Sequence, residues 1–343
     1  MTTFIKVAGL VVREGTVETK PITFEMEEGG HALLGRTEDG PPAILRALAG
    51  DLVGRGSVLV HGQPPADVRR RIALVARDAH LPDALRVEEM LSVAATIRGD
   101  TAKKPSEILA PLGIEALATR RISTLRSAER RAVALAEAIA SSVVDVLLVE
   151  EPFAELEAPA AARVLEALKQ KKGCIVVATA STRDASLIAK DYLVLERGRP
   201  VHVATFEEAE KRVHGGVVRY RLLVDDARKW LASAAVESSL GRMAIDGDSV
   251  VIEGSDAAEI ARAIGRAIVA SGVDVRLLAR DVPPLDELRA SIAGQYAGVY
   301  QAAVAHAKSA APPPGPPAAG PPPVVQAVAQ NLPTPTPRLG GDG

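Results

Sequence analysis

The sequence predicts an α/β domain, a smaller α+β domain and an unstructured C-terminal tail. Over roughly the first 200 residues, apolar runs of strand length alternate with helical patterns, which is typical of a parallel sheet covered by helices. Residues 213–283 then follow the order β-α-β-β-α-β, which indicates a ferredoxin-like unit. From residue 310 onward the chain is rich in proline, alanine and glycine and almost uncharged, so we expect disorder or polyproline II structure there.

Length and composition limit the possible functions. A chain of 343 residues suggests two domains plus additional segments. The net charge of -2 gives no electrostatic reason to expect nucleic acid as a partner. The only cysteine, Cys174, lies in an apolar run, so a disulfide framework is excluded and a reducing cytosol is expected. The histidines lack metal-ligand spacing, so no metal site is expected. No segment has the pattern of a secretory signal or a membrane span.

The first domain is predicted element by element from hydrophobic patterning. A strand, a loop and a helix are expected within 31–49, with further strands at 4–12, 21–26, 58–60, 72–75, 144–149, 174–178 and 192–196. Helical patterns are expected over about 83–140, 158–171 and 183–190. Gly15 is placed in the turn between the first two strands, and Gly198 closes the unit.

The loop between Gly35 and Gly40 has the frame of a phosphate-binding loop, which is an apolar strand, a polar loop between two glycines, and a helix. That pattern requires Lys and then Ser or Thr after the second glycine, and this chain has Pro41 and Pro42. Proline lacks an N–H group, so two amides that would cradle phosphate are lost, although a helix can still begin there. The spacing therefore predicts the shape of the loop without its chemistry. Alone, the two glycines are a weak signal, and an ordinary strand, turn and helix would be the favoured interpretation.

Two carboxylates follow within the same loop. Glu38 and Asp39 are expected where a polyanion would lie, and a like-charge contact at about 5 Å costs roughly 3 kcal/mol at an effective dielectric constant near 20. The same residues could serve as a favourable electrostatic feature at a helix start. This second interpretation is compatible with a loss of nucleotide binding.

Four stretches of the first domain occur in an order and spacing that chance does not explain, at 32–46, 123–136, 145–157 and 193–199. They resemble the phosphate loop, the signature loop and helix, the second phosphate-site strand, and the closing strand and turn of an ABC (ATP-binding cassette) transporter's nucleotide-binding domain. The resemblance covers residues 4 to about 212. It implies a cassette-type P-loop ATPase fold with antiparallel edge strands and a helical subdomain at about 78–140. It also implies a dimer in which each phosphate loop faces the partner's signature loop.

At almost every nucleotide-site position the residue differs from the family pattern. The aromatic residue that stacks on adenine would fall near Glu14, and the glutamine that senses Mg²⁺ would be Arg77. The Mg²⁺-site aspartate is Glu150, and the histidine that contacts the terminal phosphate is Ala180. Only Glu151, at the place of the catalytic base, is retained. Without Mg²⁺ or a bound phosphate a base has no role, so a structural remnant is the favoured interpretation of Glu151.

The signature loop differs as well. The family's Leu-Ser-Gly-Gly-Gln is replaced by Leu125, Arg126, Ser127, Ala128 and Glu129. The serine that contacts the partner's terminal phosphate in the family is thus an arginine. The loop is a poor donor to a partner's site, so pairing with an active ATPase would not obviously restore a composite site.

The C-terminal part resembles the appendages of cassette ATPases from bacterial exporters and motility-linked transporters. Trp230 is expected in the core of the ferredoxin-like unit at 213–283. A helix is expected at 284–309, and its first residues, Pro284 to Leu288, resemble the closing helix of such appendages. The tail at 310–343 is interpreted as a linker or as a docking segment for a partner.

These observations predict a degenerate ABC transporter subunit of bacterial type. It would act without hydrolysis, with no cofactor, as a structural or regulatory subunit at the cytoplasmic face of the inner membrane. The implied partners are a second cassette, either a copy or an active ATPase, and a membrane permease that docks on the surface between Arg77 and Ile97. One alternative is an active ATPase subunit of an exporter, with ATP and Mg²⁺ in a divergent site. Another is a soluble scaffold with the cassette fold.

Overall fold

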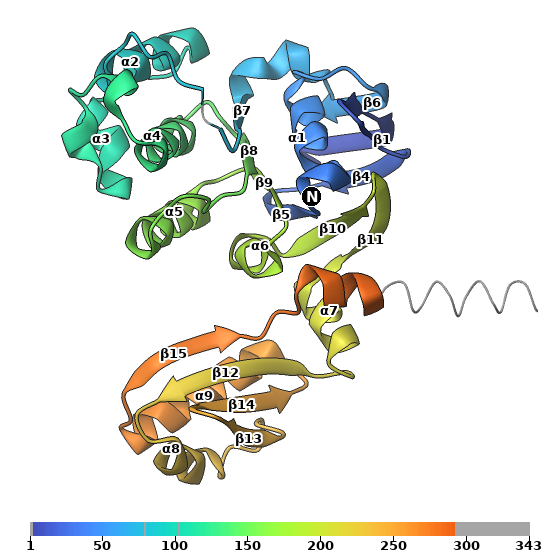
Figure 1. The fold of residues 1–343 in the computed structure, drawn as a ribbon, viewed down its shortest axis with the longest axis vertical. Coiled ribbons are helices and arrows are strands. Elements are labelled where there is room, and N and C mark those ends of the chain that lie inside the picture. The colour runs from blue at the N-terminus through green and yellow to red at the C-terminus, as the bar shows by residue number, and fades with distance from the viewer. Residues whose placement is uncertain (1–2, 79, 102, 292–343) are drawn as a thin grey trace, which may run out of the picture. The chain divides into compact units, whose positions relative to one another are not determined.

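The computed structural model describes residues 3–78, 80–101 and 103–291 (Figure 1). These residues belong to one compact unit. The helix expected beyond residue 291 and the tail expected at 310–343 lie outside the described residues. The domain boundary between residues 212 and 213 stays a prediction.

A six-stranded sheet forms the centre of the N-terminal region, in the order β11-β10-β5-β9-β8-β7. Neighbouring strands from β10 to β7 are parallel, and β11 is antiparallel at the edge. The bounds are β5 Gly29–Leu34, β7 Ile72–Val75, β8 Val146–Glu150, β9 Cys174–Thr179, β10 Asp191–Glu196 and β11 Arg199–Thr205. Side chains of β8 and β9 point alternately into two hydrophobic clusters, and burial on both faces explains their continuous apolar sequences.

Antiparallel strands and one helix cover the first face of this sheet. The second sheet has the order β4-β1-β6, and a hairpin of β2 and β3 turns at Gly15. The bounds are β1 Ile5–Val11, β2 Arg13–Glu14, β3 Val17–Glu18, β4 Ile22–Met26, β6 Arg55–Val60 and α1 Pro41–Ala49. Apolar residues of β1, β4, α1 and the central strands form one cluster, which confirms the antiparallel strands at the edge of the fold.

The remaining helices of the N-terminal region share the second hydrophobic cluster. Their bounds are α2 Val87–Arg98, α3 Pro105–Leu109, α4 Ser127–Ala140, α5 Ala158–Gln170, α6 Thr182–Ile188 and α7 Phe206–Val213. The pattern predicted over 83–140 is interrupted because Gly99 and Gly113 end helical stretches with φ of 68° and 66°. The helices of this interval, α2 to α4, lie together in Figure 1. The sequence did not predict β11 or α7.

The C-terminal region has the predicted β-α-β-β-α-β order, with the antiparallel sheet order β13-β14-β12-β15. This places the last strand beside the first and the third beside the second, as in ferredoxin-like units. The bounds are β12 Val218–Val224, α8 Ala227–Ala234, β13 Met243–Asp246, β14 Ser249–Gly254, α9 Ala257–Ser271 and β15 Val275–Arg280. Trp230 is fully buried in the cluster that these elements share, as expected.

A buried ion pair joins α7 to β15. The Glu210 carboxylate accepts a hydrogen bond from Arg280 Nε at 2.7 Å, and Glu210 is 0% exposed. Its other oxygen, Oε1, has no partner among the described residues. Burial raises the pKa of Glu210 to about 7, against the opposing effect of Arg280.

Candidate functional site

The glycine loop lies at the carboxyl end of β5 and leads into α1, at the edge where open α/β sheets bind ligands. Gly40 has φ 101°, and an added Cβ would lie 3.1 Å from Thr19 Cγ2, so this position favours glycine. Helix α1 begins at Pro41, with Pro42 next. The predicted strand, loop and helix are therefore present with both prolines in the first turn.

Four amides of the loop, those of Gly35, Arg36, Asp39 and Gly40, are hydrogen-bonded within the protein. A single 3-10 turn spans Thr37–Asp39. Within it, Asp39 N donates to Arg36 O at 2.9 Å and Gly40 N donates to Thr37 O at 3.2 Å. Arg36 N donates to the Asp39 carboxylate at 2.8 Å, and Gly35 N donates to a β9 carbonyl at 3.1 Å. A phosphate cradle needs such N–H groups to point at the ligand, and here the loop uses them itself.

Asp39 does not face the phosphate position, and that expectation from the sequence is wrong. Asp39 is 3% exposed. Its carboxylate accepts hydrogen bonds from Arg197 N at 2.7 Å and from Arg289 Nη2 at 2.6 Å. Burial alone would raise the pKa of Asp39, but the hydrogen bonds from Arg197, Arg289 and Arg36 lower it overall. The 3-10 turn directs Asp39 away from α1, toward a cavity of about 500 Å³ that Glu38 also lines.

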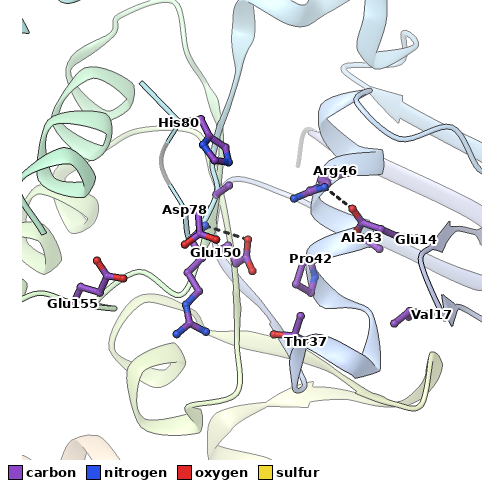
Figure 2. Close-up of a pocket in the computed structure, with 12 residues that line it drawn as sticks. Glu14, Val17, Thr37, Pro42, Ala43, Arg46, Asp78, His80, Glu150 and Glu155 are labelled. Atoms are coloured by element: carbon purple, nitrogen blue, oxygen red, sulfur yellow. Dashed lines mark hydrogen bonds and ion pairs between the residues drawn. The ribbon is translucent and has the colours of Figure 1, made fainter. Parts of the chain in front are cut away.

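A larger cavity of about 610 Å³, here called the α1 pocket, lies on the other side of the loop (Figure 2). Its lining comes from the β2–β3 hairpin, from the loop and α1, and from the segments that follow β7 and β8. The lining residues are Glu14, Val17, Thr37, Pro42, Ala43, Arg46, Ala76, Arg77, Asp78, His80, Glu150 and Glu155.

The charges of the α1 pocket suit a polyanion poorly. It has four carboxylates but only two guanidinium groups. Arg46 is already paired with Glu14 (Figure 2). Glu150 accepts a hydrogen bond from Arg77 N at 3.1 Å. With no lysine or hydroxyl at the start of α1, the residues around this pocket do not fit a magnesium nucleotide.

The curated relatives that match the chain are transport proteins. A sulfate/thiosulfate import ATP-binding protein from Synechocystis sp. is 30% identical over 202 residues, which are 55% of this chain and 57% of the relative. A molybdenum import ATP-binding protein from Granulibacter bethesdensis is 31% identical over 188 residues, which are 50% of each chain. The chain thus spans little more than half the length of these relatives. A scan of family models finds no match.

Solved structures give the fold. An ATP-binding subunit of an ABC transporter superposes with a TM-score of 0.56 at 20% identity, over 62% of this chain and 93% of that one. A dimeric ATP-binding cassette bound to ADP and Pi gives 0.53 at 16% identity, over 59% of this chain and 98% of that one. In sequence this chain is similar to import ATP-binding proteins over about half of their length. Its N-terminal region has the cassette fold.

Glu151, which the family resemblance places at the catalytic base, does not line the α1 pocket. Glu151 has φ 46°, and its carboxylate accepts hydrogen bonds from Thr179 Oγ1 at 2.7 Å and from Ala180 N at 3.2 Å. It does not contribute to the lining of the pocket, whereas Glu150 does. Both oxygens therefore bind the end of β9.

Residues 125–129, which the family resemblance aligns with the signature loop, lie at the start of helix α4. Arg126 N donates to the Glu129 carboxylate at 2.8 Å, and Arg126 is exposed with its side chain at 82%. This hydrogen bond lowers the pKa of Glu129. Leu125 is buried, and Ser127 Oγ donates to the Glu155 carboxylate. None of the positions from 125 to 129 lines the α1 pocket, so within the chain the structure does not bring loop and signature together.

Sequence reasoning missed Arg131. This residue of α4 is 1% exposed, and its guanidinium donates to the carbonyls of Ala76 at 3.0 Å and Arg77 at 2.9 Å. It also donates to the carbonyls of Glu150 and Glu151. Arg131 thereby ties together the two segments that border the pocket. Its place on the buried face of α4, in line with Leu135, was the available signal.

Two further properties apply to the described part of the chain. No cluster of three or more His, Cys, Asp or Glu side chains with the geometry of a metal site is found there. Nor is any of its helices both long enough and apolar enough to span a bilayer.

Proposed function

We propose that this chain is a cassette subunit of a bacterial membrane transport complex and that it does not hydrolyse ATP. The observation that carries this proposal is the glycine loop, in which Pro41 and Pro42 replace the phosphate-binding residues and four other amides, at 35, 36, 39 and 40, bond within the protein. The carboxylate of Glu151 engages β9. The chain would then contribute shape and contacts to the complex, at the cytoplasmic face of the inner membrane.

Calorimetric titration with Mg-ATP tests the proposal. The native chain should release no saturable heat at Mg-ATP concentrations up to about 1 mM. A Kd above about 1 mM corresponds to a binding free energy weaker than about 4 kcal/mol. A Pro41→Lys/Pro42→Ser variant is titrated in parallel, because it restores the cation and the hydroxyl of the phosphate-binding pattern. Saturable micromolar binding by the native chain, followed by hydrolysis that Glu151→Gln abolishes, would instead support the active exporter ATPase.

The partner proposed for the chain is a membrane permease, because of the outer surface of α2. Val93 is 48% exposed and Ile97 is 68% exposed. Ile97 also lines a groove of about 320 Å³ that has both apolar and charged walls, formed by Arg69, Arg70, Met90, Ala94, Ile97, Arg98 and Glu137. Such a groove suits a short helix with one apolar face. Of the lining residues, Met90, Ala94 and Ile97 belong to the surface between Arg77 and Ile97 that the family resemblance implied for a permease.

With a tagged Ile97→Asp variant, the yield of co-purified membrane protein is expected to be at least about tenfold lower than with the tagged native chain. The reason is that a charge would enter an apolar contact. Val53→Asp is the matched control, since Val53 is 92% exposed and lies outside the groove. Mass spectrometry of detergent extracts from the native host measures the yield. Equal yields from both variants would exclude this docking surface, and absence of any multispanning protein would favour the soluble scaffold.

A further inference from the structure

The C-terminal end of the described chain closes back onto the glycine loop. Residues 285–291 are helical, and we call residues 283–289 the clasp. Leu285 is 7% exposed and Leu288 is 1% exposed, and both join the hydrophobic cluster of the cassette helices. Thr182 Oγ1 donates to the Pro283 carbonyl at 2.7 Å. The clasp is therefore anchored by apolar and polar contacts before any charge is considered.

Two ion pairs of opposite polarity then join the clasp to the loop. Arg36 of the loop donates to both oxygens of Asp286, at 3.1 and 3.0 Å. Arg289 of the clasp donates to Asp39 at 2.6 Å and to the Leu195 carbonyl. Asp286 and Arg289 are three apart and so share one helix face. A shift of the helix by one turn would place like charges together, so the pairs define one register.

The two pairs differ in burial. The side chains of Arg289 and Asp39 are 12% and 5% exposed, whereas those of Arg36 and Asp286 are 52% and 71% exposed. Solvent screens the outer pair strongly, so the inner pair dominates the contact. Asp39 is also the residue that accepts the Arg36 and Arg197 amides. One carboxylate thus holds the loop turn, the β10–β11 turn and the clasp.

We propose that the clasp is an intramolecular lock on the glycine loop, in which Arg289 holds the buried carboxylate of Asp39. The inference rests on the proposed loss of nucleotide binding and adds its regulation. The lock holds residues 36–39 in the self-bonded turn, so that restoring lysine and serine alone leaves the amides of Arg36, Asp39 and Gly40 occupied. Displacement of the C-terminal helix by a partner would release the loop.

Hydrogen exchange of the full-length chain tests the lock directly. An Arg289→Met variant should speed exchange of peptides covering 30–45 and 190–200 by at least about tenfold, because the Asp39 carboxylate loses its cation. Arg36→Met removes only the exposed outer pair and should change the same peptides less than threefold. Equal exchange in both variants and the native chain would overturn the lock. Circular dichroism verifies folding, and if Arg289→Met unfolds, Arg289→Lys should give intermediate protection.

Nucleotide binding gives the second readout. In the Pro41→Lys/Pro42→Ser background, a further Asp39→Ala change should tighten Mg-ATP binding at least tenfold. Glu38→Ala is the matched control, because Glu38 has the same charge in the same loop but is exposed; it should change binding less than twofold. Equal effects of the two changes would overturn the lock. This outcome is distinct from failure of the proposed function, which is read from the native chain alone.

Discussion

Replacement of Arg131 by methionine is expected to lower the free energy of unfolding by about 3–5 kcal/mol, as when one partner of a buried charged network is removed. Arg131 is 1% exposed and donates to four carbonyl groups. Methionine fills similar space without a donor, so these oxygens would lose the hydrogen bonds from the guanidinium group. The substitution should also loosen the wall of the α1 pocket, because these carbonyls belong to the end of β8 and to the segments that follow β7 and β8.

The geometry of the guanidinium group explains why lysine should not restore the effect. Its donors form a planar fork that can reach several acceptors, whereas an ammonium group is a compact point charge. Arg131→Lys is therefore expected to retain less than half of the lost stability. Arg130→Met is the matched control, because Arg130 makes a partly exposed pair with Asp83, and such pairs contribute about 0–1 kcal/mol. Urea denaturation of the four proteins measures these differences. A loss below 1 kcal/mol for Arg131→Met would show that water replaces the guanidinium at these carbonyls.

Between pH 5 and pH 8 the native chain is expected to lose up to about 3 kcal/mol of stability that a Glu210→Gln variant does not lose. Burial raises the pKa of Glu210 from its ordinary value of 4.5 to about 7. The folded state therefore retains a proton that the unfolded state releases near pH 4.5. The contribution is complete below that pH and is lost as the pH rises to about 7.

The comparison of variants isolates Glu210 from its charged surroundings. Arg280, Glu207 and Asp281 influence the Glu210 carboxyl, and burial lowers the pKa of the neighbouring His214. These groups are present in both proteins, so their titration cancels in the difference. Urea unfolding at pH 5, 6, 7 and 8 measures the two profiles. Parallel profiles would show that Glu210 is ionised throughout this range.

The course of the fold was predictable because strands and helices follow from local hydrophobic patterning. The parallel strands around Val146–Glu150 and Cys174–Thr179 read as apolar runs because two layers cover them. By contrast, β11 and α7 were missed. The extended helical pattern was divided by Gly99 and Gly113, whose left-handed conformations were not anticipated.

The sequence by itself determined the cassette pattern and the residue types at the glycine loop. Pro41 and Pro42 lack N–H groups in any conformation, so that loss of donors required no structure. Only the tertiary structure decided where the charged side chains point. Asp39 meets Arg289, which is 250 positions away along the chain, and Arg131 meets carbonyls from two other segments. Such pairings depend on the packing of distant elements, which local patterning does not encode.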